Sequence, residues 1–368
     1  MTEFDLKAGR LAAVARAAGL GGVLVGTPPN FSWLTGGRTN RIDMTREAGA
    51  GALFVTTEAE VCVLANAIEM PRLLDEALAG LTVTPVEIPW ADERARPGWA
   101  VDAGRARTGR PVGADWPAPE AVLVDGAIAR ARVPLVPAEM ARLRAFGAEA
   151  GQTLGALCRT LRPGQTEEAV AGAAIAAFAA IGARSHVTLV GADARLPRYR
   201  HPVPTALPWR DLVMVATCVE RQGLVVALSR FVAAVSPPHA WRARLSATAE
   251  VFAALLDATR DGATGATIFA AAETAYARAG ARGEEQRHHQ GGAIGYRSRD
   301  WVAHPASTDC VTLPQTFAWN PSMSGTKIED TALVTTDGVE LITTTPDWPS
   351  LAIEVRGRTL AVADVLVL

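Results

Sequence analysis

Two segments of the chain repeat one another. Residues 162–184 read RPGQTEEAVAGAAIAAFAAIGAR and residues 260–282 read RDGATGATIFAAAETAYARAGAR; aligned without gaps, ten of the 23 positions are identical. Each copy has a threonine placed to cap a helix and ends in Gly-Ala-Arg before a strand pattern. Because alanine inflates the identity, two merely similar amphipathic helices are a second interpretation. The repeat predicts an internal duplication, with two helix–strand halves packed around a pseudo-twofold axis.

The chain before the repeats has a different pattern. Residues 6–18 read as a helix, residues 22–26 as a short apolar strand, and residues 51–56 and 60–65 as strands joined by a tight polar turn. The stretch ARVPLVPAEM, residues 131–140, contains two prolines and reads as a linker before a long amphipathic helix. We therefore predict an α/β (α+β) protein with one domain over residues 1–135 and another over 136–368.

Composition excludes several classes of protein. Apolar residues make up 49% of the 368 residues and charged residues 20%, which is typical of a globular fold. The net charge of −2 argues against nucleic acid or an anionic membrane as a partner. The four cysteines form no CxxC pair, no apolar run is long enough to span a bilayer, and the N-terminus is not a signal peptide. These features predict a cytoplasmic protein with reduced thiols.

Four motifs occur in order along the chain: NFSWLTG (30–36), LRPGQTEE (161–168), RHPVPTALPWRDLVMV (200–215) and IEDTALVTTDGVELIT (328–343). Together they resemble the creatinase/prolidase/methionine aminopeptidase superfamily, the "pita-bread" proteins. The resemblance implies a creatinase-type N-terminal α/β domain followed by a pita-bread catalytic domain with pseudo-twofold duplicated halves. Metal-dependent members hold two divalent ions with two Asp, one His and two Glu.

This chain departs from that ligand pattern. The matching positions are Ala216, Ala227, Gly292 and Asn320, and only Glu329 keeps a ligand side chain. One carboxylate cannot hold two ions, so the resemblance implies a member without most metal ligands and without a cofactor. Because a glycine replaces the metal histidine, we expect a roomier pocket at that point.

Several polar residues remain as candidates for catalysis. His201 matches a family histidine that points into the cleft, and an imidazole there can take and return a proton. His288 lies where relatives keep a substrate-binding histidine; on a strand His289 would face the opposite way, so only one should enter the cleft, and we favour His288. Lys327 and Glu329 are two apart on a predicted strand and should share a face, with the lysine holding the carboxylate ionised or binding a substrate anion. A structural ion pair is the alternative.

Other residues are candidates for substrate binding. Arg299 falls where relatives carry a second cleft histidine, and a guanidinium there could clamp an anion through two hydrogen bonds. Ser229 and Cys218 lie two residues beyond Ala227 and Ala216 and should face the cleft, where small-residue packing is favoured over covalent catalysis. In dimeric relatives the loop after NFSWLTG reaches the partner's cleft, so the candidates there are Arg38, Asn40 and Arg41.

These residues favour a metal-independent, creatinase-like enzyme that acts on a small polar anionic substrate, most simply by hydrolysing a C–N bond with His201 and Glu329. A lyase or cyclase reaction would use the same groups. One alternative is a pseudoenzyme whose cleft binds a peptide or partner protein. Another is a metallopeptidase with rearranged ligands, drawn from Glu284, Glu285, His288, His289 and Glu329. The resemblance also implies a homodimer.

Overall fold

The computed structural model describes residues 1–368, and the chain divides into two compact units, Met1–Val136 and Pro137–Leu368. The division falls one residue beyond the boundary predicted from the proline-rich linker. None of the helices is both long and apolar enough to cross a membrane. Each unit is described by itself below.

The N-terminal unit is built on a six-stranded sheet in the order β4-β3-β2-β1-β5-β6. The predicted hairpin is present as the antiparallel pair β2–β3, while β3–β4, β1–β5 and β5–β6 are parallel. The strands are β1 (Gly22–Val25), β2 (Ala52–Thr56), β3 (Val61–Asn66), β4 (Thr84–Ile88), β5 (Val112–Ala114) and β6 (Val122–Leu123). The helices are α1 (Glu3–Ala17), α2 (Pro28–Leu34), α3 (Met70–Arg72), α4 (Trp90–Ala95), α5 (Trp99–Thr108) and α6 (Asp125–Ala131).

The C-terminal unit contains two larger sheets. The first has the order β19-β9-β8-β7 and the second β11-β10-β12-β15-β16. The first comprises β7 (Arg184–Ala192), β8 (Leu212–Arg221), β9 (Leu224–Ala233) and β19 (Val365–Val367). The second comprises β10 (Gly291–Ile294), β11 (Trp301–Val302), β12 (Gln315–Trp319), β15 (Asp330–Thr335) and β16 (Gly338–Leu341). Two hairpins complete the unit, β13 (Ser322–Met323) with β14 (Thr326–Lys327) and β17 (Ser350–Val355) with β18 (Arg358–Ala363).

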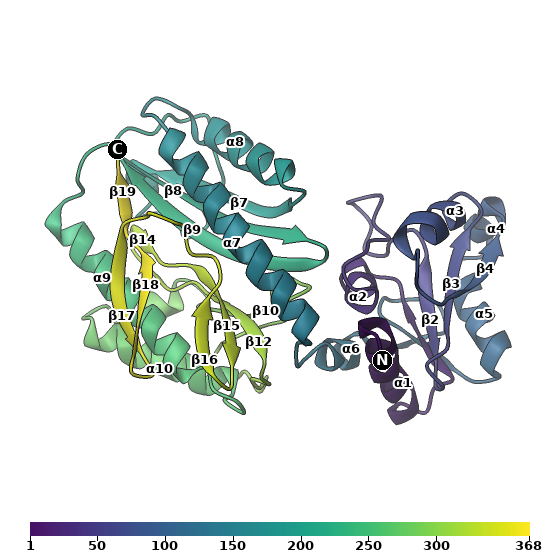
Figure 1. Ribbon diagram of the computed structural model, residues 1–368. Coiled ribbons are helices and arrows are strands. Elements are labelled where there is room, and N and C mark those ends of the chain that lie inside the picture. Colours follow the sequence, from purple (N-terminus) through teal and green to yellow (C-terminus); the bar gives the residue numbers. More distant parts are fainter. The chain divides into compact units, whose positions relative to one another are not determined.

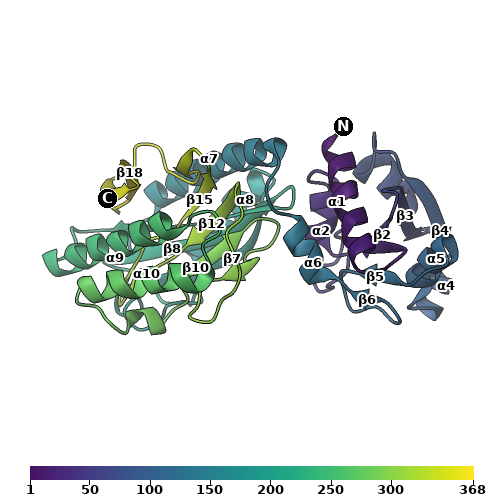
Figure 2. The same ribbon diagram turned by 90° about the horizontal axis from the view of Figure 1, so that it is seen from below.

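Four helices pack on these sheets. Helices α7 (Pro137–Thr160) and α8 (Glu167–Ala180) contact β9 and β7, whereas α9 (His239–Ala258) and α10 (Gly265–Arg278) run side by side and α9 contacts β12 (Figures 1 and 2). The long helix α7 buries the predicted apolar stripe, which includes Leu143, Phe146 and Leu154. Its period of three to four residues places these side chains on one face, against the first sheet.

The two repeated segments make matching contacts, as the duplication predicts. Both helices are capped by a threonine, whose side chain accepts a hydrogen bond from the amide three residues later. The amide of Gly164 donates to the carbonyl of Trp209 at 2.8 Å, and the amide of Gly262 donates to the carbonyl of Val311 at 2.9 Å. Strands β7-β8-β9 and β10-β12-β15 then follow in the same order.

The two sheets meet where β9 faces β15. The Thr331 hydroxyl bonds both the amide and the carbonyl of Ala227, at 2.8 and 2.9 Å, and the Ser229 amide donates to the Glu329 carbonyl at 3.0 Å. A buried ion pair, with 3.0 Å between Arg230 Nη2 and Asp330 Oδ1, joins the same strands. These contacts set the position of Glu329 relative to the first sheet.

Candidate active site

A cavity of about 330 Å³ lies in the C-terminal unit and is lined by residues from both halves. One wall comes from β7 and β8 and is mostly apolar, and the other carries the imidazoles and charged groups. The lining residues are Val187, Leu189, His201, Ala216, Thr217, Cys218, His289, Ser298, Arg299, Asn320, Lys327 and Glu329. A cavity that combines an apolar wall with a few converging polar groups is the usual form of a small-molecule site.

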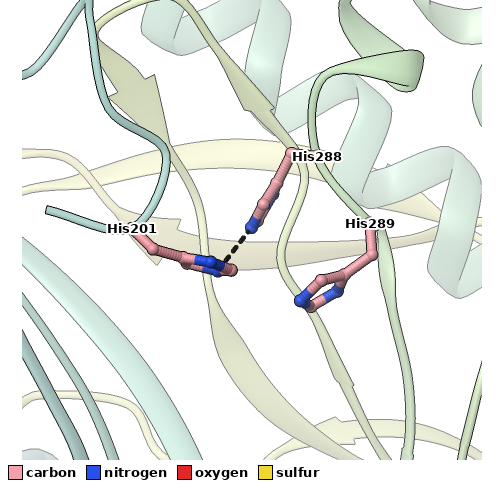
Figure 3. A group of neighbouring side chains, drawn as sticks. All are labelled: His201, His288 and His289. Atoms are coloured by element: carbon pink, nitrogen blue, oxygen red, sulfur yellow. Dashed lines mark hydrogen bonds between the residues drawn. The ribbon is translucent and has the colours of Figure 1, made fainter.

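Three histidines lie close together (Figure 3), and two of them, His201 and His289, line the cavity. His201 lies in the loop before β8, and His288 and His289 lie in the loop between a short 3₁₀ turn, Glu284–Gln286, and β10. The Nε2 atoms of His201 and His288 are 3.0 Å apart, and the ring centroids of His201 and His289 are 5.6 Å apart. The ligand nitrogens of all three lie within 4.8 Å of one another.

Only one of the adjacent histidines lines the cavity, as expected, but it is His289 and not His288, the one that we favoured. His289 lines the cavity, and His288 is buried behind it, in contact with His201. The expectation assumed a strand, in which neighbouring side chains face opposite ways, but the two residues precede β10 and lie in irregular backbone. Such backbone allows both rings to turn toward His201.

The pKa of each of the three imidazoles is lowered, which favours the neutral form near neutral pH. His288 is buried, and burial is the main cause of its lowered pKa; His201 and His289 remain partly exposed, and their partial burial also lowers the pKa. The Lys327 ammonium lowers the pKa of His201 and of His288 further. The pKa of His289 falls to about 4 through burial and through the Arg299 guanidinium. A neutral imidazole has one N–H that donates and one nitrogen that accepts, so the group can pass protons between hydrogen-bonded partners near neutral pH.

Glu329 is the carboxylate of the cavity, and two cations hold it. Lys327 Nζ lies 3.3 Å from Oε2, and Arg299 Nη2 lies 3.5 Å from Oε1. Burial lowers the pKa of Lys327, Glu329 opposes that effect, and Arg299 adds to it. Both carboxylate oxygens therefore face side-chain cations; Lys327 ends β14, and Glu329 lies in the short segment before β15 rather than on the predicted strand.

Arg299 is a cavity residue with spare hydrogen-bonding capacity. Its Nη1 donates to the Ser298 carbonyl at 2.5 Å and its Nη2 faces Glu329, while its Nε is buried without a hydrogen-bond partner. An unpartnered buried N–H is costly, and this one has no compensating hydrogen bond within the protein.

The apolar wall contains Ala216 and Cys218 of β8. Burial raises the pKa of the Cys218 thiol to about 11, which keeps it protonated and a poor nucleophile near neutral pH. Ser229 of β9 pairs with Ala216 and therefore shares its face of the sheet, but it does not line the cavity, and its buried hydroxyl has no partner.

The expectation of open space at Gly292 is wrong. A Cβ atom added there would collide with the carbonyl oxygen of Trp301, because β11 pairs with β10 at that position. Glycine is needed here because the backbones of β10 and β11 approach closely, and its lack of a side chain does not enlarge the pocket. Ala227 also lies outside the cavity, in a small apolar cluster with Cys218 and Ala318.

The candidates from the N-terminal unit have partners within that unit. Arg38 Nη1 donates to the carbonyls of Ala77 and Ala79 at 3.2 and 2.7 Å. Asn40 is buried and donates to the carbonyls of Gly26 and Gly51. Arg41 lies in the exposed-to-intermediate segment that follows. Their role in a partner's cleft stays a prediction.

Sequence reasoning missed the buried polar group behind His288. Ser322 Oγ lies 3.1 Å from His288 Nδ1, and Tyr276 and Gln290 complete the group. One signal was present in the repeat, where Tyr276 aligns with Phe178. A tyrosine in place of a phenylalanine at a buried position needs a hydrogen-bond partner, and so points to polar neighbours.

Comparison with known proteins agrees with this architecture. Residues 141–336 match metallopeptidase family M24. No curated protein sequence matches the chain. Many solved structures share the fold, and three are described here. The dipeptidase PepE of Mycobacterium ulcerans has a TM-score of 0.76 at 21% identity, over 94% of this chain and 96% of that one.

The other two are more distant in sequence. The Xaa-Pro dipeptidase of Bacillus anthracis has a TM-score of 0.74 at 16% identity, over 98% of this chain and 99% of that one. The N-terminal domain of FACT complex subunit SPT16 from chickpea (Cicer arietinum) has a TM-score of 0.69 at 11% identity, over 93% and 96%. With its duplicated halves, its two-unit architecture and the matched profile, this chain belongs to metallopeptidase family M24 and has the pita-bread fold.

Proposed function

We propose that this protein is a metal-independent hydrolase that cleaves a C–N bond in a small anionic substrate. The observation that carries the proposal is the Glu329 carboxylate, held between Lys327 and Arg299 and facing a cavity with neutral imidazoles. In this arrangement His201 exchanges the proton. Glu329 orients water or the substrate nitrogen, and Arg299, which lines the cavity, binds the substrate anion.

The name of the family implies a bound metal ion, but the charges around the cavity disfavour such an ion in this chain. A divalent ion at the three histidines would sit beside the Lys327 and Arg299 cations, whose repulsion already lowers the pKa of His289. The Glu329 oxygens, the hard ligands that such an ion would need, already face those cations. In addition, His289 Nδ1 accepts the Gly291 amide at 3.2 Å, which leaves its proton on Nε2. These ligand groups do not fit a metal centre.

A screen of small amides, amidines and N-acyl amino acids should identify a substrate. His201→Ala should then lower kcat by about 10²–10⁴-fold, the usual contribution of a general acid/base. His239→Ala is the matched control, because His239 is exposed at the start of α9 and does not line the cavity. A parental rate in His201→Ala would refute the mechanism.

Metal dependence is tested separately on the purified protein. We expect less than stoichiometric zinc, manganese or iron by elemental analysis, and full activity after treatment with a chelator. Stoichiometric metal that is lost from a variant with His201, His288 and His289 replaced by glutamine would favour the rearranged metallopeptidase instead.

A binding function is the second candidate. It is favoured by the similar fold of the SPT16 domain, which by its name is part of a complex subunit. Absence of turnover in the screen, together with loss of a bound peptide in Arg299→Ala, would support it. That the protein forms a homodimer and that it is cytoplasmic both stay predictions. Sedimentation at micromolar concentration tests the homodimer, and fractionation of the source cells tests the location.

A further inference from the structure

His288 takes part in a closed ring of buried hydrogen bonds with Gln290, Tyr276 and Ser322. Gln290 Nε2 donates to the His288 carbonyl at 2.6 Å, and the Tyr276 hydroxyl donates to Gln290 Oε1 at 2.8 Å. The Ser322 amide donates to the Tyr276 hydroxyl at 3.0 Å, and Ser322 Oγ lies 3.1 Å from His288 Nδ1. All four side chains are at most 7% exposed, so water does not compete for these bonds.

The direction of the last bond follows from the partners of the Ser322 hydroxyl. Its two polar neighbours are His288 Nδ1 at 3.1 Å and Arg200 Nη1 at 3.4 Å. A guanidinium has donors only, so it cannot accept the hydroxyl proton. A buried hydroxyl proton without an acceptor is costly, which leaves His288 Nδ1 as its acceptor.

We propose that Ser322 is a positioning residue that fixes His288 in the tautomer with its proton on Nε2. His288 then donates to His201 across the 3.0 Å contact between their Nε2 atoms. His201 accepts on Nε2, and its own proton is on Nδ1. Hydrogen bonds thus run in one direction, from Ser322 through His288 to His201, and the bond pattern of the neutral histidine pair is set before a substrate arrives.

The assignment itself needs no substrate, and only its effect on turnover rests on the proposed function. Two-bond ¹H–¹⁵N correlation spectra of protein with ¹⁵N-labelled histidine distinguish a protonated from an unprotonated ring nitrogen. The chain has six histidines, so single substitutions assign the signals. We expect the Nδ1 of His288 to be unprotonated and its Nε2 protonated in the natural protein at neutral pH.

Two variants of the same hairpin test the role of the hydroxyl. Ser322→Ala should produce a mixture of His288 tautomers or the reversed one, and Ser322→Thr should restore the natural pattern. Ser324→Ala is the control, since that hydroxyl bonds the Pro197 carbonyl rather than the site. If Ser322→Ala does not fold, the spectrum of the natural protein still decides the assignment.

A proton on His288 Nδ1 in the natural protein, or an unchanged tautomer in a folded Ser322→Ala variant, would overturn the proposal. With a substrate in hand, Ser322→Ala should lower kcat by about 10-fold while KM changes little, and Ser322→Thr should recover it. A changed tautomer with an unchanged kcat would leave the tautomer assignment standing and contradict the part that the proposed function gives to His201.

Discussion

The two halves of the C-terminal unit share a backbone plan but differ in their chemistry. Helices α8 and α10 begin with the same threonine cap and lie on strands of the same order. The first half supplies an apolar wall, with Val187, Leu189 and Ala216, whereas the second supplies most of the charged and imidazole groups. Backbone contacts therefore survive duplication without constraining which side chains face the cavity.

One aligned pair of residues shows how the halves diverged. Phe178 of α8 and Tyr276 of α10 occupy the same place in the repeat, and both are fully buried. The phenylalanine is buried and has no polar side-chain atom, while the tyrosine hydroxyl bonds Gln290 and Ser322 and so supports His288. At this position α10 therefore differs from α8 by one hydroxyl group, and that group takes part in the hydrogen bonds around His288.

The largest effect should come from Glu329→Gln, which removes the charge on which the second half depends. Lys327 and Arg299 would lose their common partner, and breaking a buried pair costs about 3–5 kcal/mol of unfolding free energy. The loss of Glu329 should lower the pKa of Lys327 still further below its ordinary value of 10.5. The folded state then binds fewer protons than the unfolded state, so the variant should gain stability as pH rises toward 10.5. Urea unfolding at several pH values measures this, and a variant as stable as the parent at pH 7 would contradict it.

Gly292→Ala tests the closest backbone approach in the second half. The added methyl group would meet the Trp301 carbonyl, so β10 and β11 must separate, at a cost of about 3 kcal/mol. The control is Gly172→Ala in the first half, where α8 leaves open space and alanine should stabilise by about 0.5–1 kcal/mol. Opposite shifts in Tm are expected. If both variants shift Tm in the same direction, the close approach at Gly292 is not what constrains this position.

Tyr276→Phe makes the second half like the first at the aligned position. It removes the hydroxyl that bonds Gln290 and Ser322, and should cost about 1–2 kcal/mol. The reverse change, Phe178→Tyr, would bury a hydroxyl among apolar groups and should also destabilise. Thermal unfolding of both variants and of the double swap would measure the asymmetry; a Tyr276→Phe variant with an unchanged Tm would contradict it.

The smallest effect concerns pH. The pKa of His289 is about 4 in the folded protein against an ordinary 6.5, so the unfolded state binds more protons between these values. Stability should therefore be fully present above pH 6.5 and fall as pH drops toward 4. His289→Gln should make that decline less steep. Hydrogen exchange should show the acid-induced opening in β10 before β7, and equal slopes for variant and parent would contradict the role of His289.

Much of the fold could be predicted from the sequence because its signals are local or periodic. The threonine caps, the apolar stripe of α7 and the duplicated segments each depend on residues a few positions apart. The ordered motifs indicated the pita-bread fold. Lys327 and Glu329 form the ion pair that was the alternative interpretation, although Glu329 lies between β14 and β15 rather than on the predicted strand.

Other features of the site depend on contacts between segments that are distant in the sequence. The sequence did not show that β11 closes the space at Gly292, or that His288 and His289 lie in irregular backbone and both turn toward His201. Nor did it show that Ser322 contacts His288, from which it is 34 positions away in the sequence. Residue types and local periodicity determine which elements form, whereas side-chain hydrogen bonds and close backbone approach depend on how those elements pack. The candidate residues could therefore be named from the sequence, whereas the residues that each of them contacts depend on the tertiary structure.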